Sequence, residues 1–209
     1  MEVKEITSEE AAELLALEES HFCDLKAREI APAKLTQSVS SFVNTAGGEI
    51  LLGITEADDG AQKVRQWVGF DDIEATNAIL QVLEGLAPLS NFYRVTYLKC
   101  VDHPGLVLHL ELQKTREIIR ATNGTAYIRR GAQKLPVVGE EALRRLELDK
   151  GISSFEDETV DIPLEDISNS VTAIEFMLTT VPTSEPDVWL KCERFALKIP
   201  RSLKQRTRS

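Results

Sequence analysis

Carboxylates and a lysine gather around a short predicted strand near the start of the sequence. Asp24 and Lys26 lie two residues apart in a segment, Phe22–Lys26, whose alternation of apolar and polar residues predicts a strand. Side chains two apart on a strand share a face. Glu19 precedes this strand, and Glu56 follows the next strongly apolar segment. Carboxylates that converge beside a lysine have the composition of a site for metal-dependent phosphodiester hydrolysis.

The same acid-x-lysine pattern also has a plainer interpretation. Charged residues make up 28% of the chain, so such pairs arise by chance and then form a solvated, salt-bridged strand edge. Spacing alone favours this structural interpretation. The chemical interpretation depends on Glu56 lying at the carboxyl edge of a central strand, where open α/β sheets bind ligands. Oxygen ligands there would suit Mg²⁺ or Mn²⁺.

The elements that must position these groups can be predicted from apolar periodicity. Residues 6–19 and 31–45 predict helices, and residues 49–54 predict a buried central strand because they are almost continuously apolar. The dipeptide Asn123-Gly124 predicts a hairpin that joins residues 118–119 to residues 127–128. Further helices are predicted at residues 71–86 and 140–148, a turn at residues 56–60, and strands at residues 93–98, 105–112 and 126–130.

These elements predict an α/β fold: one domain over residues 1–150, with a mixed sheet flanked by helices. Residues 151–209 have a diluted apolar pattern and predict a short helical C-terminal extension. The extension consists of an acidic linker, short helices at residues 168–179 and 187–196, and a basic tail. That tail is either a solvated end or an arm that binds nucleic acid.

The segment Asn44-Thr45-Ala46-Gly47-Gly48 is predicted to join the second helix to the central strand. Its glycines permit positive φ and close backbone approach, and Asn44 can bond backbone groups at the helix end. The segment is either a turn that contacts a phosphate or a tight connection without a ligand. It has no P-loop pattern, and its order is helix then strand, so the structural interpretation is favoured.

The charge distribution limits the classes of partner. A formal net charge of -10 argues against a protein whose whole surface binds nucleic acid, but leaves room for a local basic face. Four basic residues close together in sequence predict such a face, because arginines at a strand end can hold phosphates bidentately. They are Arg120, Arg129, Arg130 and Lys134.

Neither a membrane span nor a secretory signal is expected, because no apolar run is long enough and the first residues are acidic. The three cysteines are isolated, which fits a reducing cytoplasm and gives no zinc-binding pattern.

Three segments taken in order resemble the Schlafen-type AlbA domain family. They are Glu19 with Asp24-Leu25-Lys26, then the long run from Ser41 to Ile54, and finally Tyr127-Ile128-Arg129-Arg130-Gly131. The resemblance covers roughly residues 10 to 150, and the central run is specific to the family. Bacterial members of this family are often labelled as DNA-binding or ATP-binding, and some animal members are divalent-metal-dependent endoribonucleases.

The resemblance implies a site. It places the family's three catalytic acids at Glu19, Asp24 and Glu56, as ligands of Mg²⁺ or Mn²⁺, with Lys26 as the family lysine. The second and third acids are exchanged relative to the family pattern, Asp for Glu and Glu for Asp, which changes each carboxylate's reach by one methylene. Because animal members build a basic groove from two lobes, a single lobe implies a homo-oligomer or a partner protein.

Three functions follow as expectations. The first is a metal-dependent endoribonuclease that acts on transfer RNA or other structured RNA, with a role in phage defence. The second is a non-catalytic regulatory module that binds nucleic acid, RNA more readily than DNA, or a nucleotide. The third is a subunit that works only within a larger effector complex.

Overall fold

The computed structural model describes residues 2–58, 63–86, 88–154, 163, 166 and 169–180. The chain divides into two units, residues 1–153 and residues 154–209. The second unit contains helix α6 (Val171–Thr180), where a helix was predicted at residues 168–179. The predicted helix at residues 187–196 and the basic tail lie outside the described residues.

The first unit contains a five-stranded mixed sheet with the strand order β1-β6-β7-β3-β2. The outer pairs, β1 with β6 and β2 with β3, are parallel, and the inner pairs are antiparallel. The predicted α/β fold with a mixed sheet is therefore confirmed. The sheet strands are β1 (Glu2–Ile6), β2 (Cys23–Lys26), β3 (Gly48–Leu52), β6 (Tyr93–Cys100) and β7 (Leu106–Leu112).

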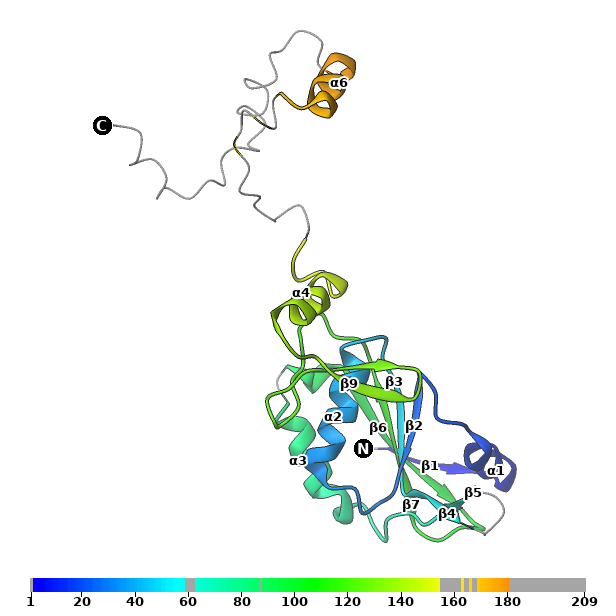
Figure 1. Cartoon of the computed structure of the whole chain (residues 1–209). Coiled ribbons are helices and arrows are strands. Elements are labelled where there is room, and N and C mark those ends of the chain that lie inside the picture. The colour runs from blue at the N-terminus through cyan, green and yellow to red at the C-terminus, as the bar shows by residue number, and fades with distance from the viewer. Residues whose placement is uncertain are drawn as a thin grey trace. The chain divides into compact units, whose positions relative to one another are not determined.

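Helices and hairpins cover both faces of this sheet (Figure 1). Helices α2 and α3 lie on one face, and α1 lies with the β4–β5 hairpin on the other. The remaining elements are α1 (Ser8–Ala16), α2 (Pro32–Val43), β4 (Ile54–Asp58), β5 (Lys63–Trp67), α3 (Asn77–Glu84), β8 (Tyr127–Arg130), β9 (Gln133–Pro136) and α4 (Glu140–Asp149), with short 3₁₀ turns at Glu74–Thr76 and Leu89–Asn91.

Strand β3 shows why the predicted central strand is continuously apolar. It lies between β7 and β2, and alternate side chains enter two separate hydrophobic clusters. Ile50 and Leu52 pack on the α2 and α3 side, whereas Leu51 packs on the α1 side. A strand buried on both faces needs apolar residues at every position.

Four predicted elements differ from the structure, and one of them, the helix predicted at residues 71–86, begins only at Asn77 after a 3₁₀ turn. The helix predicted at residues 6–19 is shorter, because Thr7 caps it through a reciprocal capping box with Glu10 and residues 2–6 pair with β6 instead. The turn predicted at residues 56–60 is strand up to Asp58, so Glu56 lies within β4 and pairs with β5. The hairpin predicted through Asn123-Gly124 is reduced to a single bridge, Arg120 to Ala126.

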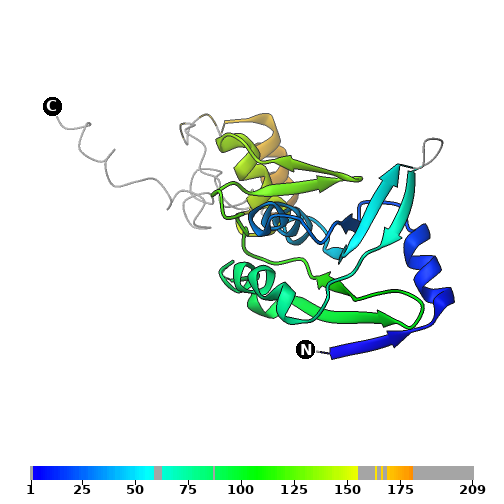
Figure 2. The same cartoon turned by 90° about the horizontal axis from the view of Figure 1, so that it is seen from below.

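The hairpin that does form nearby joins β8 to β9 around Gly131. Both hairpins, β8–β9 in yellow-green and β4–β5 in cyan, lie on the side of the domain away from β1 (Figure 2). Edge strand β2 contacts β4, and helix α2 contacts β8 and β9. The two hairpins therefore flank the strand that carries Asp24 and Lys26. Among the described residues, no helix is long and apolar enough to cross a membrane.

Candidate functional site

The free edge of strand β2 bonds to a preceding backbone amide and to polar side chains rather than to another strand. The Ser20 amide donates to the Cys23 carbonyl at 2.9 Å, and the Leu25 amide donates to Glu19 Oε1 at 3.4 Å. The Lys26 ammonium donates to the Leu25 carbonyl at 3.0 Å. Because these groups satisfy this edge, it is protected from pairing with another strand. It also becomes a row of charged groups.

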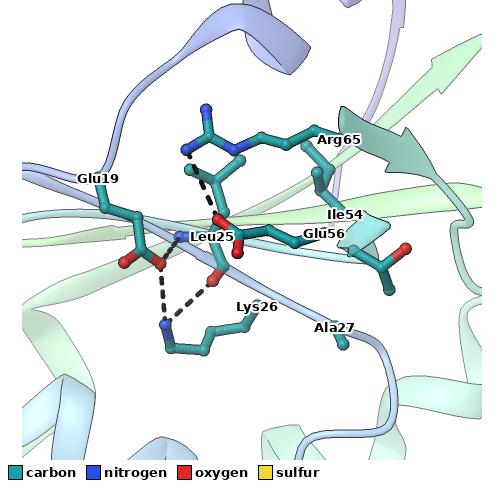
Figure 3. Close-up of a pocket in the computed structure, with 8 residues that line it drawn as sticks. Glu19, Leu25, Lys26, Ala27, Ile54, Glu56 and Arg65 are labelled. Carbon is teal, nitrogen blue, oxygen red and sulfur yellow. Dashed lines mark hydrogen bonds and ion pairs between the residues drawn. The ribbon is translucent and has the colours of Figure 1, made fainter. Parts of the chain in front are cut away.

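One pocket, of about 280 Å³, opens beside this edge. Glu19, Lys26, Glu56 and Arg65 contribute its charged lining, and they come from three separate segments of the chain. The carboxylates of Glu19 and Glu56 point toward one another across the pocket (Figure 3). Lys26 Nζ lies 3.2 Å from Glu19 Oε1, and Arg65 Nη2 lies 4.0 Å from Glu56 Oε1. The predicted convergence of Glu19, Lys26 and Glu56 is therefore present.

Asp24 shares a face with Lys26, as predicted, but it lies outside this pocket lining. Its side chain is buried, with Lys26 Nζ at 2.8 Å and Arg129 Nη2 at 3.4 Å from the same carboxylate oxygen. Lys26 thus bridges Asp24 and Glu19.

The predicted three-carboxylate metal centre does not fit this geometry. Within the described ranges, no group of three or more His, Cys, Asp or Glu side chains is placed to hold a metal ion. Glu19 and Glu56 face the pocket, whereas Asp24 is held by two cations at a buried position. The site as it stands is a pocket of two carboxylates and two cations.

Arg129 is part of the interior rather than of the surface. It is 3% exposed, and its guanidinium donates to the Ser20 carbonyl at 2.9 Å and to the Cys23 carbonyl at 3.0 Å. It also stacks over the Phe42 ring at 4.2 Å from the ring centroid, a cation–π contact. Arg129 thus connects hairpin β8–β9 to strand β2 by hydrogen bonds and to helix α2 by its contact with Phe42.

The four predicted nucleic-acid-binding residues therefore do not form a single surface. Arg120 and Arg130 are exposed, and Arg120 donates to the Gly124 carbonyl at 3.2 Å. Lys134 is half-buried and pairs across the hairpin with Arg129. Of the four, Arg129 contacts β2 directly. Lys134 lies close enough for the charges of Asp24 and Lys26 to act on the pKa of its ammonium.

The Asn44–Gly48 segment holds separate parts of the chain together. Asn44 is buried; its amide nitrogen donates to the carbonyls of Ile119 at 2.8 Å and Tyr127 at 3.1 Å, and its carbonyl accepts from the Ile119 amide at 2.9 Å. Gly48 has φ of 144°, and a Cβ there would lie 2.5 Å from the Phe22 carbonyl. These contacts are those of a scaffold turn, as the structural interpretation expected.

Arg65 is the pocket residue that sequence reasoning missed. It lies in β5, directly opposite Glu56 in the β4–β5 register. Residues 63–66 run Lys-Val-Arg-Gln, in which a β-branched valine stands among polar residues before Trp67, so the local signal for the strand is weak. The pairing itself could be inferred only once residues 54–58 were known to form the other strand.

Comparison with known proteins identifies the class. A family model described as Schlafen, AlbA_2 matches residues 19–138, more than half of the chain, so the chain belongs to that family. The matched region contains the whole pocket, the Asn44–Gly48 turn and the β8–β9 hairpin. A search of curated proteins finds no match.

Two solved structures resemble this chain in fold. The DIP2311 protein of Corynebacterium diphtheriae matches at 18% identity over 84% of this chain and 38% of its own, with a TM-score of 0.45. The N-terminal domain of a RecG-related protein from Nitrosomonas europaea matches at 22% identity over 62% of this chain and 91% of its own, also at 0.45. This chain thus spans well under half of the corynebacterial protein.

Proposed function

We propose that this Schlafen AlbA_2 domain acts on nucleic acid, RNA in preference to DNA, and cuts it in the pocket beside β2. One observation carries the proposal: the pocket assembles two carboxylates and two cations from three separate segments of the chain. Charged groups that are brought together from distant segments and left partly open to solvent are typical of a site rather than of a folding core.

The pocket residues suit phosphodiester chemistry on RNA. A carboxylate, Glu56 in particular, can accept the proton of a ribose 2′-hydroxyl as that oxygen attacks the adjacent phosphorus. The bond from phosphorus to the 5′-oxygen then breaks, which leaves a 2′,3′-cyclic phosphate on one product and a 5′-hydroxyl, protonated from water, on the other. The cations of Lys26 and Arg65 can stabilise the charge that develops on the phosphate oxygens. Because DNA lacks the 2′-hydroxyl, this chemistry favours RNA.

A more specific form of the proposal is that cleavage depends on a divalent metal ion. The family resemblance assigns Glu19, Asp24 and Glu56 as ligands, yet Asp24 is held by Lys26 and Arg129. Metal-dependent cutting would therefore require Asp24 to be released from both cations. The same geometry makes Asp24→Ala a poor test variant. It would leave the buried Arg129 guanidinium without its carboxylate partner and so destabilise the fold.

The test is incubation with transfer RNA and with single-stranded DNA, in Mn²⁺ and in EDTA. Glu56→Gln should slow RNA cleavage by roughly 10²- to 10⁴-fold. Glu5→Gln, which removes a carboxylate from strand β1 at the opposite edge of the sheet, should leave it unchanged. Cleavage that needs Mn²⁺ and is lost in a folded Asp24→Asn variant would support the metal-dependent form.

A non-catalytic binding module is the second candidate, favoured by the fully paired state of Asp24. It predicts salt-sensitive RNA binding without cleavage. The absence of cleavage under every condition would overturn the nuclease proposal. Activity that appears only on addition of a partner protein would instead favour the subunit role.

A further inference from the structure

Cations outnumber carboxylates on the α2 side of strand β2. Lys26 and Arg129 share the single carboxylate of Asp24. Lys34 and Lys134 are close enough for their charges to act on one another. Asp24 and Glu19, which also contacts Lys26, supply two negative charges against the four positive ones. In a chain with a net charge of -10, this is a local positive region.

The fold builds this cluster from three elements. Arg129 and Lys134 are register partners in the antiparallel β8–β9 hairpin, so their side chains lie on the same face of the hairpin. Helix α2 contacts both strands of that hairpin and carries Lys34 near its start. Lys26 comes from β2. The cations are therefore fixed by tertiary structure, although they are far apart in the sequence.

Lys34 and Lys134 are the members of the cluster whose ammonium groups lack a partner. Among the described residues neither ammonium makes a hydrogen bond or an ion pair, whereas Lys26 and Arg129 each make several. Lys34 is exposed, and Lys134 is half-buried. Burial lowers the pKa of the Lys134 ammonium, and the nearby charges of Lys26, Lys34 and Arg129 lower it further, opposed by Asp24. A half-buried ammonium beside three other cations is unfavourable unless an anion approaches.

Phosphate is the anion that fits this position. Lysine ammonium groups bind phosphate as point charges, and several cations around one phosphate offset its charge without any base-specific contact. Lys26 belongs to both the cluster and the pocket, so a strand of nucleic acid bound at the cluster would continue into the pocket.

We infer that Lys34 and Lys134, with Lys26 between them and the pocket, bind a backbone phosphate of a single RNA strand that enters the pocket beside β2. The choice of RNA as the occupant rests on the proposed function. The phosphate contact itself does not require that the RNA be cut.

The test measures binding of a labelled single-stranded RNA by fluorescence anisotropy over a range of salt concentrations. Lys134→Met keeps the aliphatic stem and removes the charge, and Lys34→Met does the same at an exposed position. Lys4→Met is the matched control, since it removes an exposed lysine from β1 at the other edge of the sheet. Catalytic turnover is measured separately on transfer RNA.

Each of the two lysine variants should weaken binding about equally for all RNA sequences, and each should reduce the salt-dependence slope by about 0.7. Lys4→Met should bind as the wild type does. Lysine-dependent binding without any cleavage would support this inference and overturn the nuclease proposal. Cleavage with wild-type binding in both variants would overturn the inference alone, and binding of ATP but not RNA would overturn the choice of occupant.

Discussion

Two regions of the domain contain the same types of charged residue in different surroundings. Near α2 one pair of charged side chains is buried, whereas in the pocket beside β2 the charged side chains are more open to solvent. Asp24 and Arg129 are 3% exposed each and are paired with one another. Glu56 and Arg65 form a looser pair at 4.0 Å, and the Glu56 side chain is 47% exposed. A charge that is buried and paired fixes the fold, whereas a charge that is open to solvent remains available to a ligand.

Lys26 lies between these two regions and belongs to both. Its ammonium contacts buried Asp24 at 2.8 Å and the pocket residue Glu19 at 3.2 Å. In one acid-x-lysine pair, therefore, the acid can stabilise the fold while the lysine faces the pocket. The variants below separate the two regions by their effects on stability.

The largest expected effect is on the buried ion pair. Arg129→Met should lower the free energy of unfolding by about 3–5 kcal/mol, because it leaves the Asp24 carboxylate buried with one cation fewer. The measurement is urea unfolding followed by circular dichroism. Arg130→Met is the matched control on the same strand, and because Arg130 is exposed it should change stability by less than about 0.5 kcal/mol. Equal effects of the two substitutions would contradict a structural role for Arg129.

Lys150 provides a pH-dependent test of the buried region. Its ammonium donates to the Thr115 carbonyl at 2.7 Å and to the Val43 carbonyl at 3.1 Å, at the end of α2. Burial, together with the nearby charge of Lys114, lowers the pKa of Lys150 to about 8 from 10.5. Between these values the unfolded chain binds more protons than the folded one, so stability should rise with pH, by on the order of 3 kcal/mol in all.

The measurement for Lys150 is the free energy of unfolding at several pH values from 7 to about 10.5. Lys150→Met should remove the rise, because the substituted side chain does not titrate. The difference between wild type and variant isolates this lysine from other groups that titrate in the range. The same slope in both proteins would show that Lys150 keeps an ordinary pKa in the folded state.

Asn44 is a neutral polar residue that is buried at the end of α2. Asn44→Ala should cost about 2 kcal/mol, since it leaves the Ile119 amide without an acceptor in the interior and removes two further hydrogen bonds, to the carbonyls of Ile119 and Tyr127. Chemical denaturation measures this cost. Asn123→Ala is the control, because Asn123 is exposed and its side chain hydrogen-bonds within its own turn and to Tyr127. A loss in the control as large as that in Asn44→Ala would contradict the special role of Asn44.

Much of the fold could be predicted because apolar periodicity is a local signal. The continuous apolar run of β3 and the face shared by Asp24 and Lys26 follow from strand geometry alone. The first strand could not be predicted, since residues 2–5 are exposed and β1 forms only by parallel pairing with β6. That pairing depends on residues almost one hundred positions away.

The pocket could be predicted only in part, since Arg65 was missed and Asp24 lies outside its lining. Glu19, Lys26 and Glu56 do meet in one pocket. The burial of Arg129 could not be predicted, because its acceptors are carbonyls of Ser20 and Cys23, more than one hundred residues earlier in the chain. A sequence pattern gives the charge of a residue, whereas the tertiary contacts decide whether that charge serves the fold or a ligand.

The smallest expected effect belongs to the open pair in the pocket. Arg65→Met and Glu56→Gln should each change the free energy of unfolding by less than about 1 kcal/mol, because an ion pair at 4.0 Å whose carboxylate is 47% exposed contributes little net stability. The two substitutions combined should be close to the sum of the singles in a double-mutant cycle, and any coupling should shrink at high salt. If either one destabilised the domain as much as Arg129→Met does, the pair would be part of the folding core. The contrast between the two regions would then fail, and with it the argument that these charges are held open for a substrate.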